Sequence, residues 1–129
     1  MKKLLLTLLI TVTCLSIMKA QTPTTAAGKM LRHVVLFKFK DNSSAADVKK
    51  VETAFKKLPS QIKEIKGFEW GTNNSPENLN QGFTHSFFLS FNSEEDRAVY
   101  LPHPAHKAFG ALLTPHLDKV LVIDYWTKD

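Results

Sequence analysis

Cysteine is nearly missing from this sequence, because Cys14 is the only one in 129 residues. It lies in a segment that we interpret below as a signal peptide, so a chain cleaved after Ala20 would have no disulfide and no thiol nucleophile. The alternative is a lipoprotein acylated at Cys14. Thr13 and Thr11 stand where such sites usually carry a small residue and a leucine, and we therefore expect cleavage without lipidation.

A large excess of one charge is also missing. The formal net charge is +5, but Lys2, Lys3 and Lys19 belong to the N-terminal segment, and the remainder has 14 basic and 12 acidic side chains. It contains no basic run and no basic patch interleaved with aromatic residues, which disfavours nucleic-acid binding. Glycine-rich phosphate loops, HExxH motifs, Ser/His/Asp signatures and EF-hand spacing are absent as well.

The first twenty residues have the pattern of a secretory signal peptide. A basic start precedes an apolar stretch over residues 4–17, which is short for a membrane span of about 20 residues. We predict a signal peptide at 1–20, a flexible linker at 21–29 and one domain at 30–129. The expected location is periplasmic or secreted, with no stable membrane insertion after cleavage; a retained N-terminal anchor is the alternative.

Periodicity predicts an α+β fold. Residues 31–40, 67–72, 82–92 and 120–126 have the composition of strands. Residues 45–58 have helical spacing and end at Pro59, and a second helix, broken by a His-Pro motif, ends near Pro115. The order β-α-β-β-α-β is that of a ferredoxin-like unit. Because the first strand is apolar on both faces, its second face needs a cover, and we expect a homodimer.

The residues best suited to chemistry lie between Tyr100 and His106. Tyr100, His103 and His106 follow one another at three-residue steps and could share a helix face, although Pro102 and Pro104 distort that helix. A phenol and an imidazole side by side can act as donor and acceptor around an oxygen-bearing ligand. In the purely structural alternative, Tyr100 packs on the sheet and His103 shapes a turn.

Two further histidines lie in predicted strands. His33 and His85 share strand faces with phenylalanines, including Phe87, and could be hydrogen-bonded core residues or could line a cavity. His33, His85 and His106 together could supply the three nitrogens of a zinc or iron site. Because no paired carboxylate and no metal motif accompany them, we expect no metal and no cofactor.

Several motifs together resemble one family, the stress-responsive dimeric A/B barrel proteins. They lie at residues 33–40, 82–85, 91–94, 100–106 and 117–125. The resemblance spans about residues 31–125. It implies ferredoxin-like units whose sheets pair into an α/β barrel across a homodimer, which agrees with the two apolar faces of the first strand.

The resemblance also implies a site. A plant member of the family that cyclises a polyketide has a catalytic tyrosine and histidine that correspond to Tyr100 and His106. Its pocket histidines correspond to His33, His85 and His103. Phe55 stands where that enzyme has a pocket tyrosine, which puts the same substrate in doubt, and we place Phe87 in the same predicted pocket.

We therefore expect a secreted homodimer that binds a small organic molecule, with cyclase- or lyase-like acid/base catalysis as an extension. His106 would accept a proton, Tyr100 would hydrogen-bond the oxygen that develops charge, and His33 and His85 would position the ligand. One alternative is a non-catalytic, stress-related structural or interaction protein. Another is a dimeric-barrel monooxygenase that acts on aromatic substrates or haem.

Overall fold

The structure is a computed structural model that describes residues 28–128. The predicted signal peptide, Cys14 and most of the predicted linker lie outside the described residues. No helix among residues 28–128 combines the length and the hydropathy that crossing a bilayer requires.

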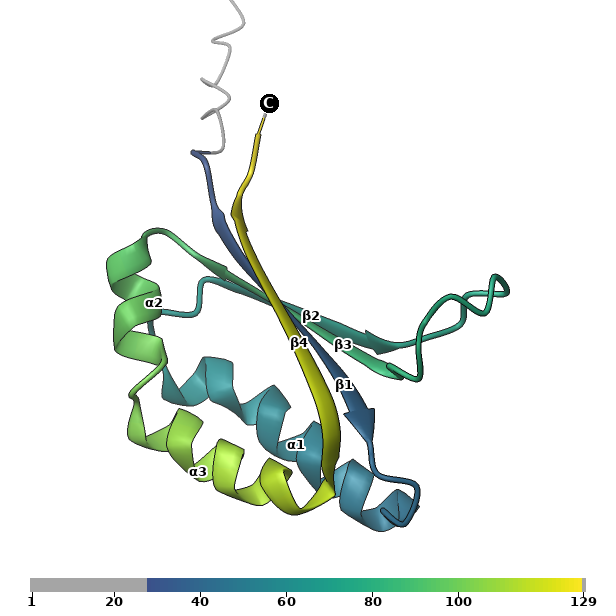
Figure 1. Ribbon diagram of the computed structural model, residues 1–129. Helices are drawn as coiled ribbons and strands as arrows, with labels where there is room; N and C mark the ends of the chain where they lie inside the picture. Colours follow the sequence, from purple (N-terminus) through teal and green to yellow (C-terminus); the bar gives the residue numbers. More distant parts are fainter. Residues whose placement is uncertain (1–27, 129) are drawn as a thin grey trace, which may run out of the picture.

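One antiparallel sheet forms the centre of the domain (Figure 1). Its strands are β1 (Leu31–Phe39), β2 (Gly67–Thr72), β3 (His85–Phe91) and β4 (Leu117–Trp126), in the order β2-β3-β1-β4. The two central strands are therefore β3 and β1, and β4 is an edge strand paired with β1 alone. This arrangement confirms the predicted ferredoxin-like fold.

The helices lie on one face of the sheet (Figure 1). They are α1 (Ala45–Gln61), α2 (Glu94–Tyr100) and α3 (Pro104–Leu113), and the 3-10 turn η1 (Thr114–His116) leads into β4. Ser44 and Ser93 cap α1 and α2, and their hydroxyls accept hydrogen bonds from the backbone N–H groups of Asp47 and Asp96. Such caps satisfy donors that a helix leaves free in its first turn.

The prediction that Pro59 ends the first helix is wrong. Pro59 lies inside α1, which runs on to Gln61, and the N–H of Ile62 still donates to the carbonyl of Leu58 at 2.9 Å. Proline removes one hydrogen bond of the helix, but Leu58 and Ile62 on either side of it are buried. Their packing holds the last turn in place.

The third and fourth strands also differ from the predicted boundaries. β3 begins at His85 rather than Gly82, because Gln81 and Gly82 have positive φ angles of 50° and 82° and belong to the preceding turn. β4 begins at Leu117, where it already pairs with Phe39.

The core lies between the sheet and the helices and is rich in phenylalanine. The ring of Phe55 from α1 lies 4.1 Å from that of Phe87 and 4.7 Å from that of Phe109, and Phe37 packs against all three. Aromatic pairs of this kind stabilise a core beyond their buried area.

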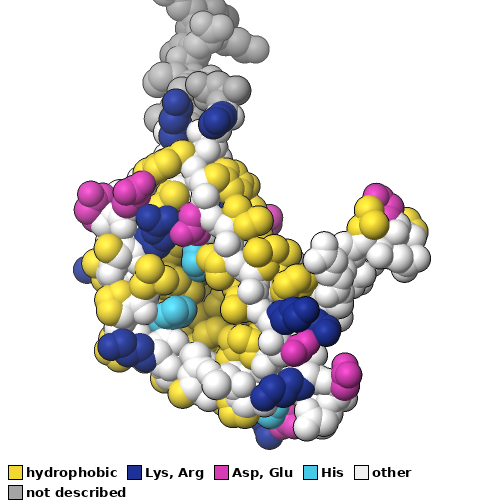
Figure 2. All heavy atoms as spheres, in the orientation of Figure 1, with side chains coloured by type: hydrophobic (Ala, Val, Ile, Leu, Met, Phe, Trp, Pro, Cys, Tyr) yellow, Lys and Arg dark blue, Asp and Glu magenta, His cyan; other side chains and the backbone are white. Residues whose placement is uncertain are grey.

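The helices leave the inner face of β4 uncovered. Val120 and Val122 pair with Phe37 and Val35 and so face the helix side of the sheet, yet they remain 49% and 48% exposed. Figure 2 shows the result as an apolar hollow between β4 and the helices, with histidine side chains beside it. We call this hollow the β4 cleft.

Candidate active site

Tyr100 is the centre of the candidate site. It is the last residue of α2, its exposed fraction is 0%, and its hydroxyl is the one buried side-chain polar atom among the described residues that has no hydrogen-bond partner. Burial raises the pKa of the Tyr100 phenol above its ordinary range. The phenol therefore stays protonated and is a hydrogen-bond donor without an acceptor.

His106 lies against Tyr100. A turn at residues 101–103 separates α2 from α3, and it brings the two ring centroids to 4.4 Å. The carbonyl of Leu101 accepts a hydrogen bond from His106 Nδ1 at 2.9 Å. Because this bond places the ring proton on Nδ1, Nε2 of the neutral imidazole keeps its lone pair. His106 can therefore accept a proton at Nε2.

His33 lies on the other side of Tyr100. Its ring centroid is 5.6 Å from that of Tyr100, and its Nδ1 donates to Asp124 Oδ1 at 2.6 Å. The second carboxylate oxygen of Asp124 accepts from Arg97 Nη1 at 2.7 Å. One carboxylate on β4 thus connects β1 to α2 and fixes the orientation of the imidazole.

Sequence reasoning missed Asp124 and Arg97. A signal was present for Asp124, because it is the one charged residue in the apolar run at 120–126. Arg97 carried no comparable signal, since its role depends on the contact that the fold makes between α2 and β4.

The protonation of His33 follows from its burial. Desolvation lowers the pKa of His33, although the hydrogen bond and charge of Asp124 act in the opposite direction; His106 and Arg97 add to the lowering. His33 therefore tends to be neutral near pH 7.

The folded protein should lose stability as the pH falls below about 6.5, the ordinary pKa of histidine. Because the pKa of folded His33 is lowered, the unfolded chain binds more protons in this range, and a pKa lowered by one unit corresponds to about 1.4 kcal/mol. Urea unfolding at pH 7.5 and 5.5 measures the loss. His33→Asn, which keeps a donor for Asp124, should show a smaller loss; an equal loss would assign the effect to other groups.

The structure does not bring His85 to this cluster. His85 pairs with Phe37, four residues along β1 from His33, which separates the two by roughly 13 Å along the sheet. Both of its nitrogens are occupied, by Thr84 Oγ1 at 2.8 Å and by Glu52 Oε1 at 3.2 Å. Within the described residues its contacts are those of a hydrogen-bonded core histidine.

His103 also points elsewhere. Its Nδ1 accepts a hydrogen bond from the N–H of Ala105 at 3.1 Å and so caps α3. The three residues do not share a helix face, because the predicted break at the His-Pro motif separates α2, which ends at Tyr100, from α3. Tyr100 and His106 meet through the turn.

Phe55 and Phe87 lie in the core and not at the cleft, with exposed fractions of 1% and 0%. The three-histidine metal hypothesis finds no support in the geometry. Residues 28–128 contain no group of three or more His, Cys, Asp or Glu side chains placed to hold a metal ion.

The antiparallel sheet, the helices on one face and the tyrosine between two histidines define a ferredoxin-like α+β domain with a polar cluster beside an apolar cleft. The sequence pattern of the Stress responsive A/B Barrel Domain matches residues 31–127, and the chain belongs to this family.

Individual relatives agree with this assignment. A stress-response A/B barrel domain-containing protein of Arabidopsis thaliana is 43% identical over 95 residues, which cover 74% of this chain and 87% of the relative. Olivetolic acid cyclase of Cannabis sativa is 30% identical over 95 residues, covering 74% of this chain and 94% of the cyclase.

Two solved structures have the same fold. The hydroxynitrile lyase from Passiflora edulis superposes with a TM-score of 0.73 at 25% identity, covering 78% of this chain and 94% of the lyase. A dimeric ferredoxin-like protein from Thermobifida fusca gives a TM-score of 0.67 at 26% identity, covering 78% of this chain and 93% of that protein.

Proposed function

We propose that the β4 cleft binds a small organic molecule through a hydroxyl or carbonyl oxygen. The observation that carries this proposal is the unpartnered hydroxyl of Tyr100. A buried donor without an acceptor costs free energy in the folded protein. The hydroxyl has no accessible surface in the described structure, so a ligand oxygen reaches it and completes its hydrogen bonding only when the side chains over it move. The exposed valines of β4 would contact the apolar part of that molecule.

The same residues suit acid/base catalysis. Tyr100 donates a hydrogen bond to the oxygen where charge develops, and Nε2 of His106 accepts a proton from a hydroxyl or an activated carbon. His33, oriented by Asp124 and through it by Arg97, acts as a positioning residue. Two relatives support this class of function, because their names describe a cyclase and a lyase.

Mandelonitrile, a hydroxynitrile, is a suitable probe. A base removes the hydroxyl proton, the bond to the nitrile carbon breaks with its electrons on cyanide, and cyanide takes up a proton; benzaldehyde and hydrogen cyanide form. Binding is followed by NMR of the histidine ring carbons, and turnover by the absorbance of benzaldehyde. A set of ketones and phenols extends the binding measurement.

His106→Ala should lower turnover by about 10²- to 10⁴-fold, the range of general acid/base contributions. Lys107→Ala is the control, because Lys107 is an exposed neighbour on the same helix. Retained turnover in His106→Ala would remove His106 from the mechanism. If no compound of the set shifts the resonances of His33 or His106, the binding function itself is wrong.

We also propose that the outer face of the sheet is a homodimer interface. Val34 and Leu36 lie on this face beside Leu121, Ile123 and Tyr125, and these three β4 side chains are 40% to 49% exposed. A contiguous apolar surface of this kind marks an interaction site. The dimeric relative of known structure supports a second copy of the chain as the partner.

Ile123→Glu should convert the dimer to a monomer, because two charges would be buried without partners at the interface. Sedimentation equilibrium measures the mass. Val122→Glu places the same charge on the other face of β4 and should leave the dimer intact. A dimer that survives Ile123→Glu but not Val122→Glu would place the interface on the cleft side.

A further inference from the structure

We infer that a second site, separate from the β4 cleft, binds a free carboxylate with one alkyl chain. It is a groove between α1 and α3 with a volume of about 560 Å³. None of the side chains in the Tyr100 cluster lines it. We call it the α1–α3 groove.

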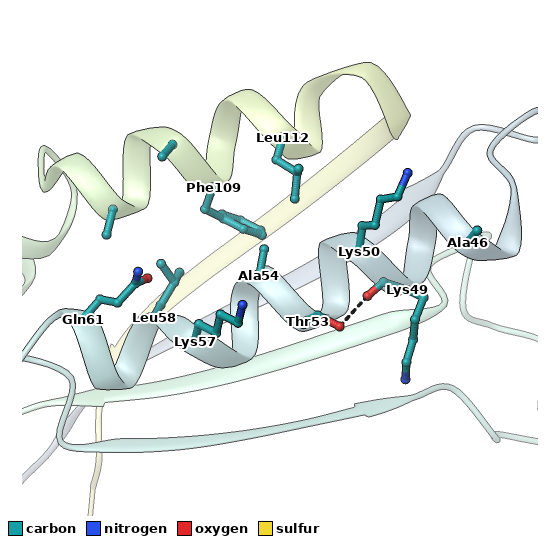
Figure 3. A pocket seen from close by; sticks show the side chains of 12 residues that line it. Ala46, Lys49, Lys50, Thr53, Ala54, Lys57, Leu58, Gln61, Phe109 and Leu112 are labelled. Atoms are coloured by element: carbon teal, nitrogen blue, oxygen red, sulfur yellow. Dashed lines mark hydrogen bonds between the residues drawn. The ribbon is translucent and has the colours of Figure 1, made fainter.

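The floor of the α1–α3 groove is apolar. Figure 3 shows Phe109 and Leu112 of α3 facing the side of α1 that carries Ala54 and Leu58. Ala105 and Ala108 also line it, and their small side chains leave the space that larger residues would fill. Leu112 is 39% exposed, so part of this apolar surface is left to solvent in the described chain.

The rim of the groove is cationic. Lys49, Lys50 and Lys57 line it, and no acidic side chain does. Lys49 points away from α3 in Figure 3 and pairs with Glu52 at 3.1 Å, whereas Lys50 extends toward α3. Lys50 pairs with the half-buried Asp47 at 3.3 Å, and no ion pair of Lys57 is found within residues 28–128. Lys57 is therefore the first cation for an anionic ligand, and Lys50, which extends toward α3, would have to exchange Asp47 for the ligand.

This combination fits a carboxylate with one alkyl chain. The volume falls within the usual range of small-molecule pockets, about 300–1,000 Å³. The lining residues of α1 run from Ala46 to Gln61, which gives a trough of about 22 Å at 1.5 Å per residue. An alkyl chain would bury apolar surface along the floor, while its carboxylate would meet the lysines at the rim.

Decanoate is the probe, titrated below its micelle concentration by isothermal titration calorimetry into the full-length chain. We expect saturable binding that Ala108→Trp weakens at least about tenfold, because an indole would fill the groove. Lys50→Glu combined with Lys57→Glu should weaken it about tenfold, because the carboxylate would meet two negative charges where it now meets cations. Circular dichroism verifies that each variant is folded.

The control is Lys107→Glu, which makes a charge reversal on α3 outside the groove and should leave affinity within about twofold. Comparison with 1-decanol tests the role of charge, and vesicles of phosphatidylglycerol test a membrane surface. Equal affinity for decanoate and 1-decanol, unchanged affinity in Ala108→Trp, or binding to vesicles without binding of free decanoate would each overturn the inference.

Discussion

Replacing Tyr100 with phenylalanine is expected to make the folded protein more stable and its site inactive. The hydroxyl is buried without a partner, and such a group costs about 1–3 kcal/mol. Removing the hydroxyl also loses some close packing, which lowers stability. The net free energy of unfolding should therefore rise by about 1 kcal/mol. Urea unfolding measures this change.

Activity should change in the opposite direction. The Tyr100 hydroxyl is the donor that we place at the oxygen of the substrate, and loss of one such donor lowers turnover by about 10²- to 10³-fold. Tyr125→Phe removes the only other phenol of the sequence, which lies in the proposed dimer interface on the outer face of the sheet; it should leave turnover unchanged, and sedimentation equilibrium verifies that the dimer is retained. A Tyr100→Phe protein that is less stable would mean that the hydroxyl has a partner in the folded chain.

Replacing Phe55 with alanine is expected to lower the free energy of unfolding by about 3–5 kcal/mol. Phe55 is 1% exposed and contacts Phe37, Phe87 and Phe109, so truncation leaves a cavity where the helices meet the sheet. Thermal and urea unfolding measure the loss.

Phe55→Tyr separates a core role from a pocket role. In the core, the added hydroxyl would lie among phenylalanine rings without an acceptor and would lower stability. In a pocket, it would be tolerated and would alter ligand binding. Phe83→Ala is a control at a partly buried position and should cost less than Phe55→Ala. A stable Phe55→Tyr with changed affinity would restore the pocket interpretation.

Much of the fold could be predicted because local rules and tertiary structure agree. The side chains of β1 alternate between a buried helix-facing row and a partly exposed row, as the two-residue period of a strand requires. Ser44 and Ser93 cap the helices that their position in the sequence indicates. Pro59 was misread because proline disfavours a helix interior locally, whereas the packing of Leu58 and Ile62 decides the outcome in the fold.

The site could be predicted only in part. Tyr100 and His106 are near neighbours in the sequence, and a short turn was enough to bring them together. His33 lies near them because β1 and β4 pair with His33 opposite Asp124. The register between two strands cannot be read from the sequence of one strand. His85 has the same local pattern as His33, but it lies farther along the sheet, where Glu52 and Thr84 use both of its nitrogens.

The register of β4 on β1 determines both the candidate site and the proposed dimer interface. Successive β4 side chains belong to different surfaces, with Asp124 on the cleft side and Ile123 on the outer side. A slip of one residue would exchange the two sides at once: the carboxylate would leave His33, and Ile123 or Tyr125 would replace it according to the direction of the slip. The irregularity between Lys38 and Phe39 lies where the strands first pair. An insertion or deletion there that shifts the register should disturb the Asp124–His33 pair and the outer apolar face together.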